Sequence, residues 1–290
     1  MKNANNINTV AVSAISSPFE EQLFIKGTQT LAKLGVTLQY SDNIFKKTGF
    51  TVGTPEQRAC DILNNICNEQ IQGIFFARGG YGASQILPLI DKKNIRDYLN
   101  NKTIMGYSDV TSLFCYLYSK YSKQCIYGPN ICSQYFNNKK LIKKVLEGKL
   151  GTHQKIRILN KKSGNIKAPV FGGCLSVLTS MVGTPYLRNL KDHILFIEDT
   201  NEAPYKIDRM LTQLTQSGLI KGIKAIAVGA MEKCDSPKIT WKDTIANTAD
   251  KLKIPAIYGI KAGHAGFDSI IKLGAIASID MNKKEFEIKD

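Results

Sequence analysis

The sequence of 290 residues has few of the features that mark membrane-spanning, metal-binding or disulfide-linked proteins. No apolar stretch approaches the roughly eighteen residues of a membrane-spanning helix. The three histidines lie far apart, and neither H-E-x-x-H nor a C-x-x-C pair occurs. The glycine-rich segment 78–82 lacks the G-x-G-x-x-G spacing of dinucleotide-binding proteins. We therefore expect no membrane association, no metal and no cofactor.

The seven cysteines are odd in number, which is typical of reduced thiols in a reducing compartment. The apolar run 9–14 is short, β-branched and interrupted by serine, unlike the core of a secretory leader. We interpret this run as a first buried strand and expect a cytoplasmic protein, with a periplasmic location by an unusual export route left open. Cys174, which follows two glycines, is the one thiol whose setting suggests reactivity, but no histidine lies near it in the sequence.

The chain carries a net charge of +15, and ten of its basic residues fall between Lys139 and Lys167. These residues are mostly lysines, lack interleaved aromatic side chains and match no nucleic-acid-binding motif. The pattern favours a solvated surface, and we expect no nucleic-acid partner. Salt-sensitive DNA retention without hydrolysis would instead favour a non-catalytic binding protein with polyanionic partners.

Short β-branched runs alternate with helical patterns through the first half of the chain. Such alternation predicts a Rossmann-like parallel sheet covered on both faces. In these sheets ligands collect at the carboxyl ends of the strands, where the turns 78–82 and 106–109 fall. Strands are predicted at 9–13, 36–40, 73–77, 103–105 and 124–127, and helices at 19–34 and 55–68.

The second half has more β character after residue 166. Strands are predicted at 193–197, 225–228 and 276–280, with one strong helix at 207–217. We therefore predict an α/β protein with an N-terminal domain (1–147), a polar linker (148–165) and a smaller, β-rich C-terminal α/β domain (166–290).

Ser108 stands between a strand-like run and a helix-like run, with Gly106 two residues before it. A nucleophilic serine is presented on such a turn, where backbone N–H groups can receive an oxyanion. Val110 replaces the second glycine of the hydrolase pattern G-x-S-x-G, so the pattern is half matched. The alternative interpretation is a helix N-cap at Ser108, with Asp109 favoured by the helix dipole.

Glu198 and His264 lie at predicted strand ends in apolar surroundings. Each could be structural, because carboxylates often stabilise turns and a histidine between glycines is often a hydrogen-bonding loop residue. Together with Ser108 they provide the nucleophile, base and carboxylate of a catalytic triad. His153 lies in the polar connecting stretch and His193 follows a charged turn, so His264 is the best candidate base.

A series of ordered motifs resembles the LD-carboxypeptidases, also called muramoyltetrapeptide carboxypeptidases, a family that includes the microcin C immunity peptidases. The motifs extend over nearly the whole chain. They are ARGGYG (77–82), GYSDVT (106–111), GGCLS (172–176), GTPY (183–186), ED (198–199), EAPYKIDRML (202–211) and GHAG (263–266).

The resemblance implies hydrolysis of the bond between an L-centre and a terminal D-amino acid, typically meso-diaminopimelate to D-alanine in murein tetrapeptides during cell-wall recycling. It implies a site between the domains and a homodimer. The implied catalytic residues are Ser108, Glu198 and His264, and the implied oxyanion hole is made by backbone amides of Gly79, Gly80 and Asp109. A peptidase for a peptide-nucleotide antibiotic or another acylated amino acid, with the same triad, remains an alternative.

A carboxypeptidase must bind a free carboxylate, and Arg78 is the candidate cation, with Tyr81 as a second candidate substrate contact. Arg78 could instead pair with a neighbouring acid and hold its own loop. Two positions depart from the family pattern: Tyr127 stands where relatives have histidine, and Cys174 replaces asparagine. Neither departure falls on the triad, but both change the possible hydrogen bonds to substrate.

Overall fold

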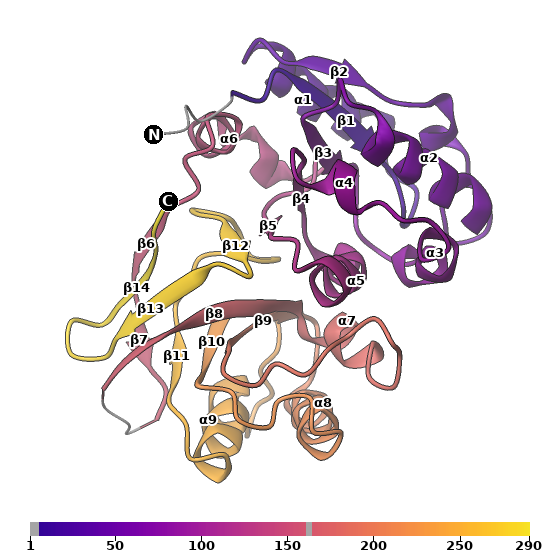
Figure 1. Ribbon diagram of the computed structural model, residues 1–290. Coiled ribbons are helices and arrows are strands. Elements are labelled where there is room, and N and C mark those ends of the chain that lie inside the picture. The colour runs from indigo at the N-terminus through magenta and orange to yellow at the C-terminus, as the bar shows by residue number, and fades with distance from the viewer. Residues whose placement is uncertain (1–5, 161–163) are drawn as a thin grey trace. The chain divides into compact units, whose positions relative to one another are not determined.

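The chain folds into two compact units, Met1–Leu150 and Gly151–Asp290. The computed structural model describes residues 6–160 and 164–290 (Figure 1). None of the helices in these described ranges is long and apolar enough to cross a membrane.

The first unit contains a parallel sheet whose strands run in the order β5-β4-β3-β1-β2. The Rossmann-like fold predicted for the N-terminal half is therefore confirmed. The predicted strands match the observed ones to within one or two residues. They are β1 (Thr9–Ser13), β2 (Thr37–Gln39), β3 (Gly73–Phe76), β4 (Thr103–Gly106) and β5 (Cys125–Tyr127).

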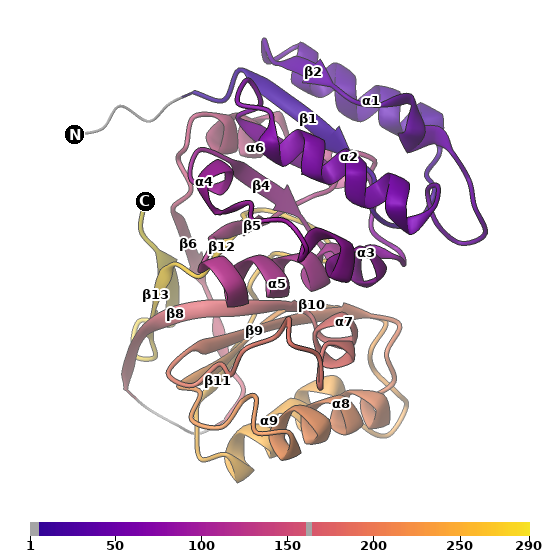
Figure 2. The ribbon, with the colours of Figure 1, turned by 45° about the vertical axis from the view of Figure 1, so that its right-hand side comes forward.

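Helix α3 contacts both α2 and α5 (Figure 2). Helix α1 contacts a short 3₁₀ turn, η3 (Gln134–Asn137). Because helices cover both faces, the central strand β3 is buried at every position. The helices are α1 (Glu21–Ala32), α2 (Pro55–Cys67), α3 (Ala83–Ile90), α4 (Arg96–Leu99), α5 (Thr111–Tyr121) and α6 (Lys139–Leu146), with further 3₁₀ turns η1 (Asp42–Phe45) and η2 (Ser108–Val110).

Local sequence explains where the predicted helix α2 begins. Thr54 and Gln57 form a capping box, and Pro55 occupies the first helical position, where its missing N–H is not needed. Ala59, Ile62 and Ile66 form the buried face, as the helical period predicts.

The second unit has an eight-stranded mixed sheet, in the order β6-β14-β13-β8-β9-β10-β11-β7. Strands β8 to β11 are parallel neighbours, and the others pair antiparallel. The elements are β6 (Thr152–Lys155), β7 (Arg157–Ile158), β8 (Asn165–Cys174), α7 (Leu175–Ser180), β9 (Ile194–Thr200), α8 (Pro204–Gln216), β10 (Ala225–Glu232), α9 (Trp241–Lys251), β11 (Ala256–Tyr258), β12 (Ile271–Leu273), β13 (Ile276–Asp280) and β14 (Glu285–Ile288).

Several elements of this unit were not predicted. The segment 148–165, which we expected to be a linker, contributes β6 and β7 to the sheet, and its residues 161–163 lie outside the described ranges. Strand β8 was missed because Pro169 and two glycines interrupt its β-branched pattern. Strand β13 coincides with the predicted strand 276–280, and α8 begins earlier than predicted because Pro204 is its first residue.

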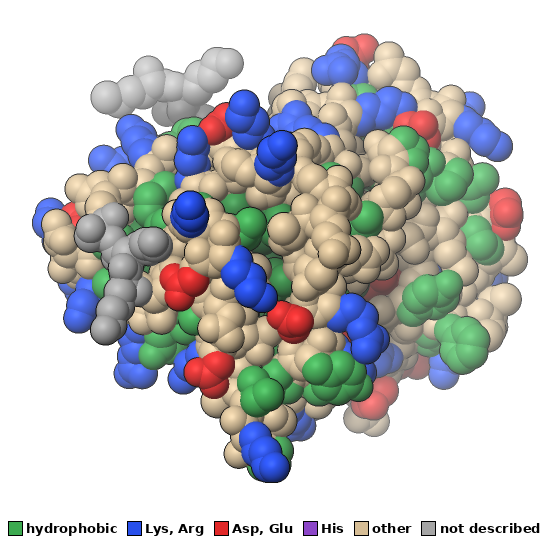
Figure 3. Space-filling view, turned by 90° about the horizontal axis from the view of Figure 1, so that it is seen from below, with side chains coloured by type: hydrophobic (Ala, Val, Ile, Leu, Met, Phe, Trp, Pro, Cys, Tyr) green, Lys and Arg blue, Asp and Glu red, His purple; other side chains and the backbone are tan. Residues whose placement is uncertain are grey.

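Basic side chains do not gather into a single patch on the face drawn in Figure 3. Figure 3 shows Lys and Arg side chains scattered over one face, with Asp and Glu side chains between them. This distribution is that of a solvated surface with charges of both signs.

Candidate active site

Ser108 occupies a strained turn directly after β4. Its φ is +65°, a left-handed conformation that is uncommon for a residue other than glycine. Backbone strain of this kind persists where the surrounding structure enforces it, often at functional sites. Tyr107, not Ser108, occupies the N-cap of η2, so the alternative N-cap interpretation of Ser108 is wrong. The turn runs from strand to helix, as the nucleophile interpretation requires.

The carboxylate of Asp109 holds this turn against two neighbouring loops. Asp109 is buried, and its Oδ2 accepts hydrogen bonds from Ser16 Oγ at 2.6 Å and from the backbone N–H of Ala83 at 2.8 Å. Burial raises the pKa of Asp109, although these two hydrogen bonds act in the opposite direction. Asp109 thus links the segments that follow β1, β3 and β4 at the carboxyl edge of the sheet.

Gly79 lies against the Ser108 side chain. A Cβ atom at Gly79 would lie 2.8 Å from Ser108 Cβ and 2.9 Å from its Oγ, closer than real Cβ contacts. The same turn is tied to Ser17, whose N–H donates to Gly79 O at 3.2 Å and whose Oγ accepts from Tyr81 N at 3.1 Å. The fold therefore brings the predicted segments 78–82 and 106–109 together.

Tyr127, one of the two departures from the family pattern, touches the backbone of the candidate nucleophile. Its hydroxyl oxygen accepts a hydrogen bond from Ser108 N at 3.3 Å, and its side chain is fully buried. This contact cannot be predicted from the sequence, because β5 and the Ser108 turn become neighbours only through strand pairing.

Glu198 and His264 form a hydrogen-bonded pair in the second unit. Glu198, on β9, has no exposed surface, and its Oε2 accepts from His264 Nδ1 at 2.8 Å and from His264 N at 2.9 Å. A side chain at Gly263 would place its Cβ 2.3 Å from Glu198 Oε2, so only glycine allows this approach. The carboxylate therefore fixes both the backbone and the ring of the histidine.

The pairing sets the chemistry of the imidazole. Because Nδ1 donates to Glu198, neutral His264 carries its lone pair on Nε2, the atom that accepts a proton in a catalytic base. Burial alone would lower the pKa of His264, but the hydrogen bond and negative charge of Glu198 outweigh it and raise this pKa above its usual 6.5. The arrangement stabilises the imidazolium that forms when the base takes a proton.

Cys174, the last residue of β8, lies beside Glu198, its register partner on the neighbouring strand β9. Burial, together with the negative charges of Asp199 and Glu198, raises the pKa of the Cys174 thiol well above its usual value. The thiol therefore stays protonated at neutral pH. This agrees with the interpretation that Cys174 is no nucleophile.

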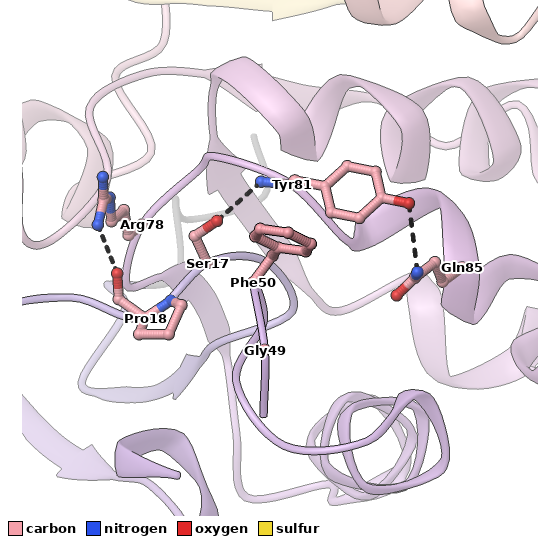
Figure 4. Close-up of a pocket in the computed structure, with 7 residues that line it drawn as sticks. All are labelled: Ser17, Pro18, Gly49, Phe50, Arg78, Tyr81 and Gln85. Atoms are coloured by element: carbon pink, nitrogen blue, oxygen red, sulfur yellow. Dashed lines mark hydrogen bonds between the residues drawn. The ribbon is translucent and has the colours of Figure 1, made fainter. Parts of the chain in front are cut away.

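Arg78 and Tyr81 line a pocket of about 790 Å³ in the first unit (Figure 4). The guanidinium of Arg78 donates to the carbonyl of Pro18 and, within the described chain, does not form an ion pair with an acidic side chain. The alternative expectation, an Arg78–acid pair, is therefore wrong. Tyr81 is half exposed, and its hydroxyl accepts from Gln85 Nε2 at 3.3 Å.

Arg58, a buried arginine of α2 that supports the rim of this pocket, was not among the predicted site residues. Its guanidinium donates to Gly53 O at 2.9 Å and to Gln85 Oε1 at 2.6 Å. The available signal was its place one helical turn before Ile62 on the buried face of α2.

Among residues 6–160 and 164–290, no cluster of three histidine, cysteine or acidic side chains could hold a metal ion.

A serine on a strained strand-to-helix turn and a histidine held by a buried carboxylate are components of serine peptidases. Residues 10–128 match the LD-carboxypeptidase N-terminal domain, and residues 167–279 match the LD-carboxypeptidase C-terminal domain. The chain belongs to the LD-carboxypeptidase family, and it is a serine carboxypeptidase.

Relatives in sequence agree with this assignment. A Rickettsia conorii protein named as a carboxypeptidase is 30% identical over 267 residues, which cover 88% of this chain and 82% of the relative. A Bacillus subtilis protein named as a murein peptide carboxypeptidase is 26% identical over 98% of this chain and 92% of its own.

Two solved structures share the fold. The muramoyltetrapeptide carboxypeptidase from Oxalobacter formigenes aligns with a TM-score of 0.85 at 22% identity, covering 97% of this chain and 99% of its own. The microcin C7 self-immunity protein MccF, known from Escherichia coli, aligns with a TM-score of 0.86 at 22% identity, covering 98% of this chain and 96% of its own.

Proposed function

We propose that this carboxypeptidase removes the terminal D-alanine from murein tetrapeptides, with Ser108, His264 and Glu198 as its catalytic triad. The observation that carries this proposal is the hydrogen bond from His264 Nδ1 to buried Glu198, which leaves Nε2 as the proton acceptor. The strained turn at Ser108 supports the role of that serine as the nucleophile.

In the proposed reaction, Ser108 Oγ attacks the carbonyl carbon of the last peptide bond, and its proton passes to His264 Nε2. Backbone N–H groups of Gly79, Gly80 and Asp109 donate hydrogen bonds to the oxyanion. The tetrahedral intermediate then breaks the C–N bond as His264 returns the proton to the leaving amine. Water, deprotonated by His264, hydrolyses the acyl-enzyme and releases the shortened peptide.

Arg78 binds the C-terminal carboxylate in this scheme, and Tyr81 is a neighbouring substrate contact. The guanidinium lies on the exposed side of the 78–82 turn, whose Gly79 is in contact with the nucleophile. A cation so placed can hold a carboxylate near the reacting bond, and charge-assisted hydrogen bonds are the stronger kind.

The murein substrate is supported by the names of the Bacillus subtilis and Oxalobacter formigenes proteins. A role in peptidoglycan recycling is consistent with that substrate. None of the seven cysteines, all within the described residues, forms a disulfide, which supports a cytoplasmic place of action. We propose a homodimer from the family resemblance alone, and light scattering of the purified protein tests this oligomeric state. We propose no nucleic-acid partner, and a measurement of DNA retention at low salt tests this expectation.

The deciding experiment incubates the purified protein with a murein tetrapeptide ending in D-alanine and follows the products by mass spectrometry. Ser108→Ala is the matched control. We expect the wild type to release D-alanine and the variant to release none. If the wild type leaves the peptide intact but cleaves aspartyl sulfamoyl adenosine, the compound bound in a solved MccF structure, the murein assignment is wrong and the triad assignment remains.

A further inference from the structure

The pocket beside Arg78 lies where the strand order of the first sheet reverses. Strand β1 has β2 on one side and β3 on the other, and ligands of such sheets bind outside the carboxyl ends of strands at this reversal. The pocket is lined by the segments that follow β1 and β3 and by one further loop. Its lining residues include Ser17, Pro18, Phe50, Arg78, Tyr81 and Gln85 (Figure 4).

Phe50 is presented to this pocket on a firmly held turn. The backbones of Thr48 and Thr51 exchange two hydrogen bonds across the turn, at 2.9 and 3.2 Å, while 81% of the Phe50 side chain is exposed. Two hydrogen bonds also hold Val52, the residue after the turn: Val52 N donates to Ser16 O at 2.9 Å, and Arg58 donates to Val52 O at 3.3 Å. An exposed aromatic ring on a fixed backbone is suited to contact a ligand.

Tyr81 provides a second exposed aromatic wall, with 51% of its side chain accessible. Two hydrogen bonds hold it in place, from Tyr81 N to Ser17 Oγ at 3.1 Å and from Gln85 Nε2 to its hydroxyl at 3.3 Å (Figure 4). The pocket thus combines apolar walls with one cation, Arg78.

The size of the pocket exceeds what alanine requires. Its volume of about 790 Å³ falls within the range of pockets that hold drug-sized ligands, whereas the alanine side chain is a single methyl group. Gly79, which follows Arg78, contacts the Ser108 side chain. A substrate whose carboxylate binds Arg78 would therefore direct its last side chain toward Phe50 and Tyr81.

We propose that this pocket receives the side chain of the C-terminal D-amino acid and accepts residues larger than alanine, with Phe50 and Tyr81 as its apolar walls. This rests on the proposed function, in which Arg78 binds the terminal carboxylate. Phe50 is then a specificity-determining residue of the enzyme.

The test compares kcat/KM for three tetrapeptides that differ only in a terminal D-alanine, D-leucine or D-phenylalanine. We expect the wild type to cleave the larger two at least as efficiently as the first. Phe50→Ala should lower kcat/KM for the D-phenylalanine peptide by about tenfold or more, with little change for D-alanine. Tyr98→Ala, which truncates an exposed aromatic of α4 outside this pocket, should leave all three unchanged.

Two results of this kinetic comparison would overturn the proposal: cleavage of the D-alanine peptide only, or an equal loss for all three peptides in Phe50→Ala. Binding of the D-phenylalanine peptide to the inactive Ser108→Ala variant separates this proposal from the proposed function. Tight binding that Phe50→Ala weakens supports the pocket even if the wild type cleaves no tetrapeptide. If this peptide binds no better than the D-alanine peptide, the pocket assignment is wrong.

Discussion

Replacing Gly79 with alanine tests whether this residue positions the nucleophile. The new Cβ would lie 2.8 Å from Ser108 Cβ, about 0.7 Å inside the lower end of the roughly 3.5–4.0 Å range of carbon–carbon contacts. Both atoms are attached directly to backbone, so rotation of a flexible side chain cannot relieve the overlap. The Ser108 turn must therefore shift by several tenths of an ångström.

A displacement on the order of 1 Å can cost about a hundredfold in rate, so we expect Gly79→Ala to lower kcat by about that factor. Overpacking should also lower the free energy of unfolding by roughly 1–3 kcal/mol. Steady-state kinetics on the cleaved tetrapeptide and urea unfolding measure the two effects separately.

Gly35→Ala is the matched control for stability. Gly35 has a φ of +77° and nothing within 4 Å of its Cβ position, so alanine there introduces backbone strain without a clash. We expect a loss of about 1–2 kcal/mol in stability with an unchanged kcat. The reasoning is refuted if Gly79→Ala keeps the wild-type kcat, because Gly79 would then not lie against the working nucleophile.

Two further variants test the groups that hold the candidate triad. Glu198→Gln removes the charge that raises the pKa of His264, so the acid limb of the pH profile of kcat/KM should move to lower pH than in the wild type. Its kcat should fall by about 10²- to 10⁴-fold, and an unmoved limb would contradict the pairing. Asp109→Ala leaves Ser16 Oγ and Ala83 N without their acceptor and should lower the free energy of unfolding by roughly 2–4 kcal/mol in urea titrations. Because folding raises the pKa of Asp109, its protonated form favours the native state, and wild-type stability should fall as pH rises from about 3.8 through the raised pKa. If the stability of Asp109→Ala depends on pH over this range with the same slope as that of the wild type, another titrating group is responsible.

Much of the first unit could be predicted because its elements follow local periods. Strand 73–76 is a continuous apolar run, and strand 9–13 has an apolar, β-branched centre. Helix α2 has both its capping signal and its buried stripe in one window of sequence. The second unit was harder to predict. Strand β8 contains proline and glycines, and it is stabilised by partners far away in the chain, β9 and β13.

The sequence by itself determined the types of chemical group available at this site: a serine after a strand, a carboxylate in an apolar strand, a histidine between glycines, and glycines in the turns. The tertiary structure decided which of these groups meet. His264 and Glu198 are 66 residues apart, and their hydrogen bond exists only because β9 ends beside the 263–266 turn. The contact of Tyr127 with Ser108 N and the burial of Asp109 are likewise products of packing. The physical reason is that strand and helix periods depend on residues close together in the chain, whereas hydrogen bonds and pKa shifts depend on neighbours that only folding supplies.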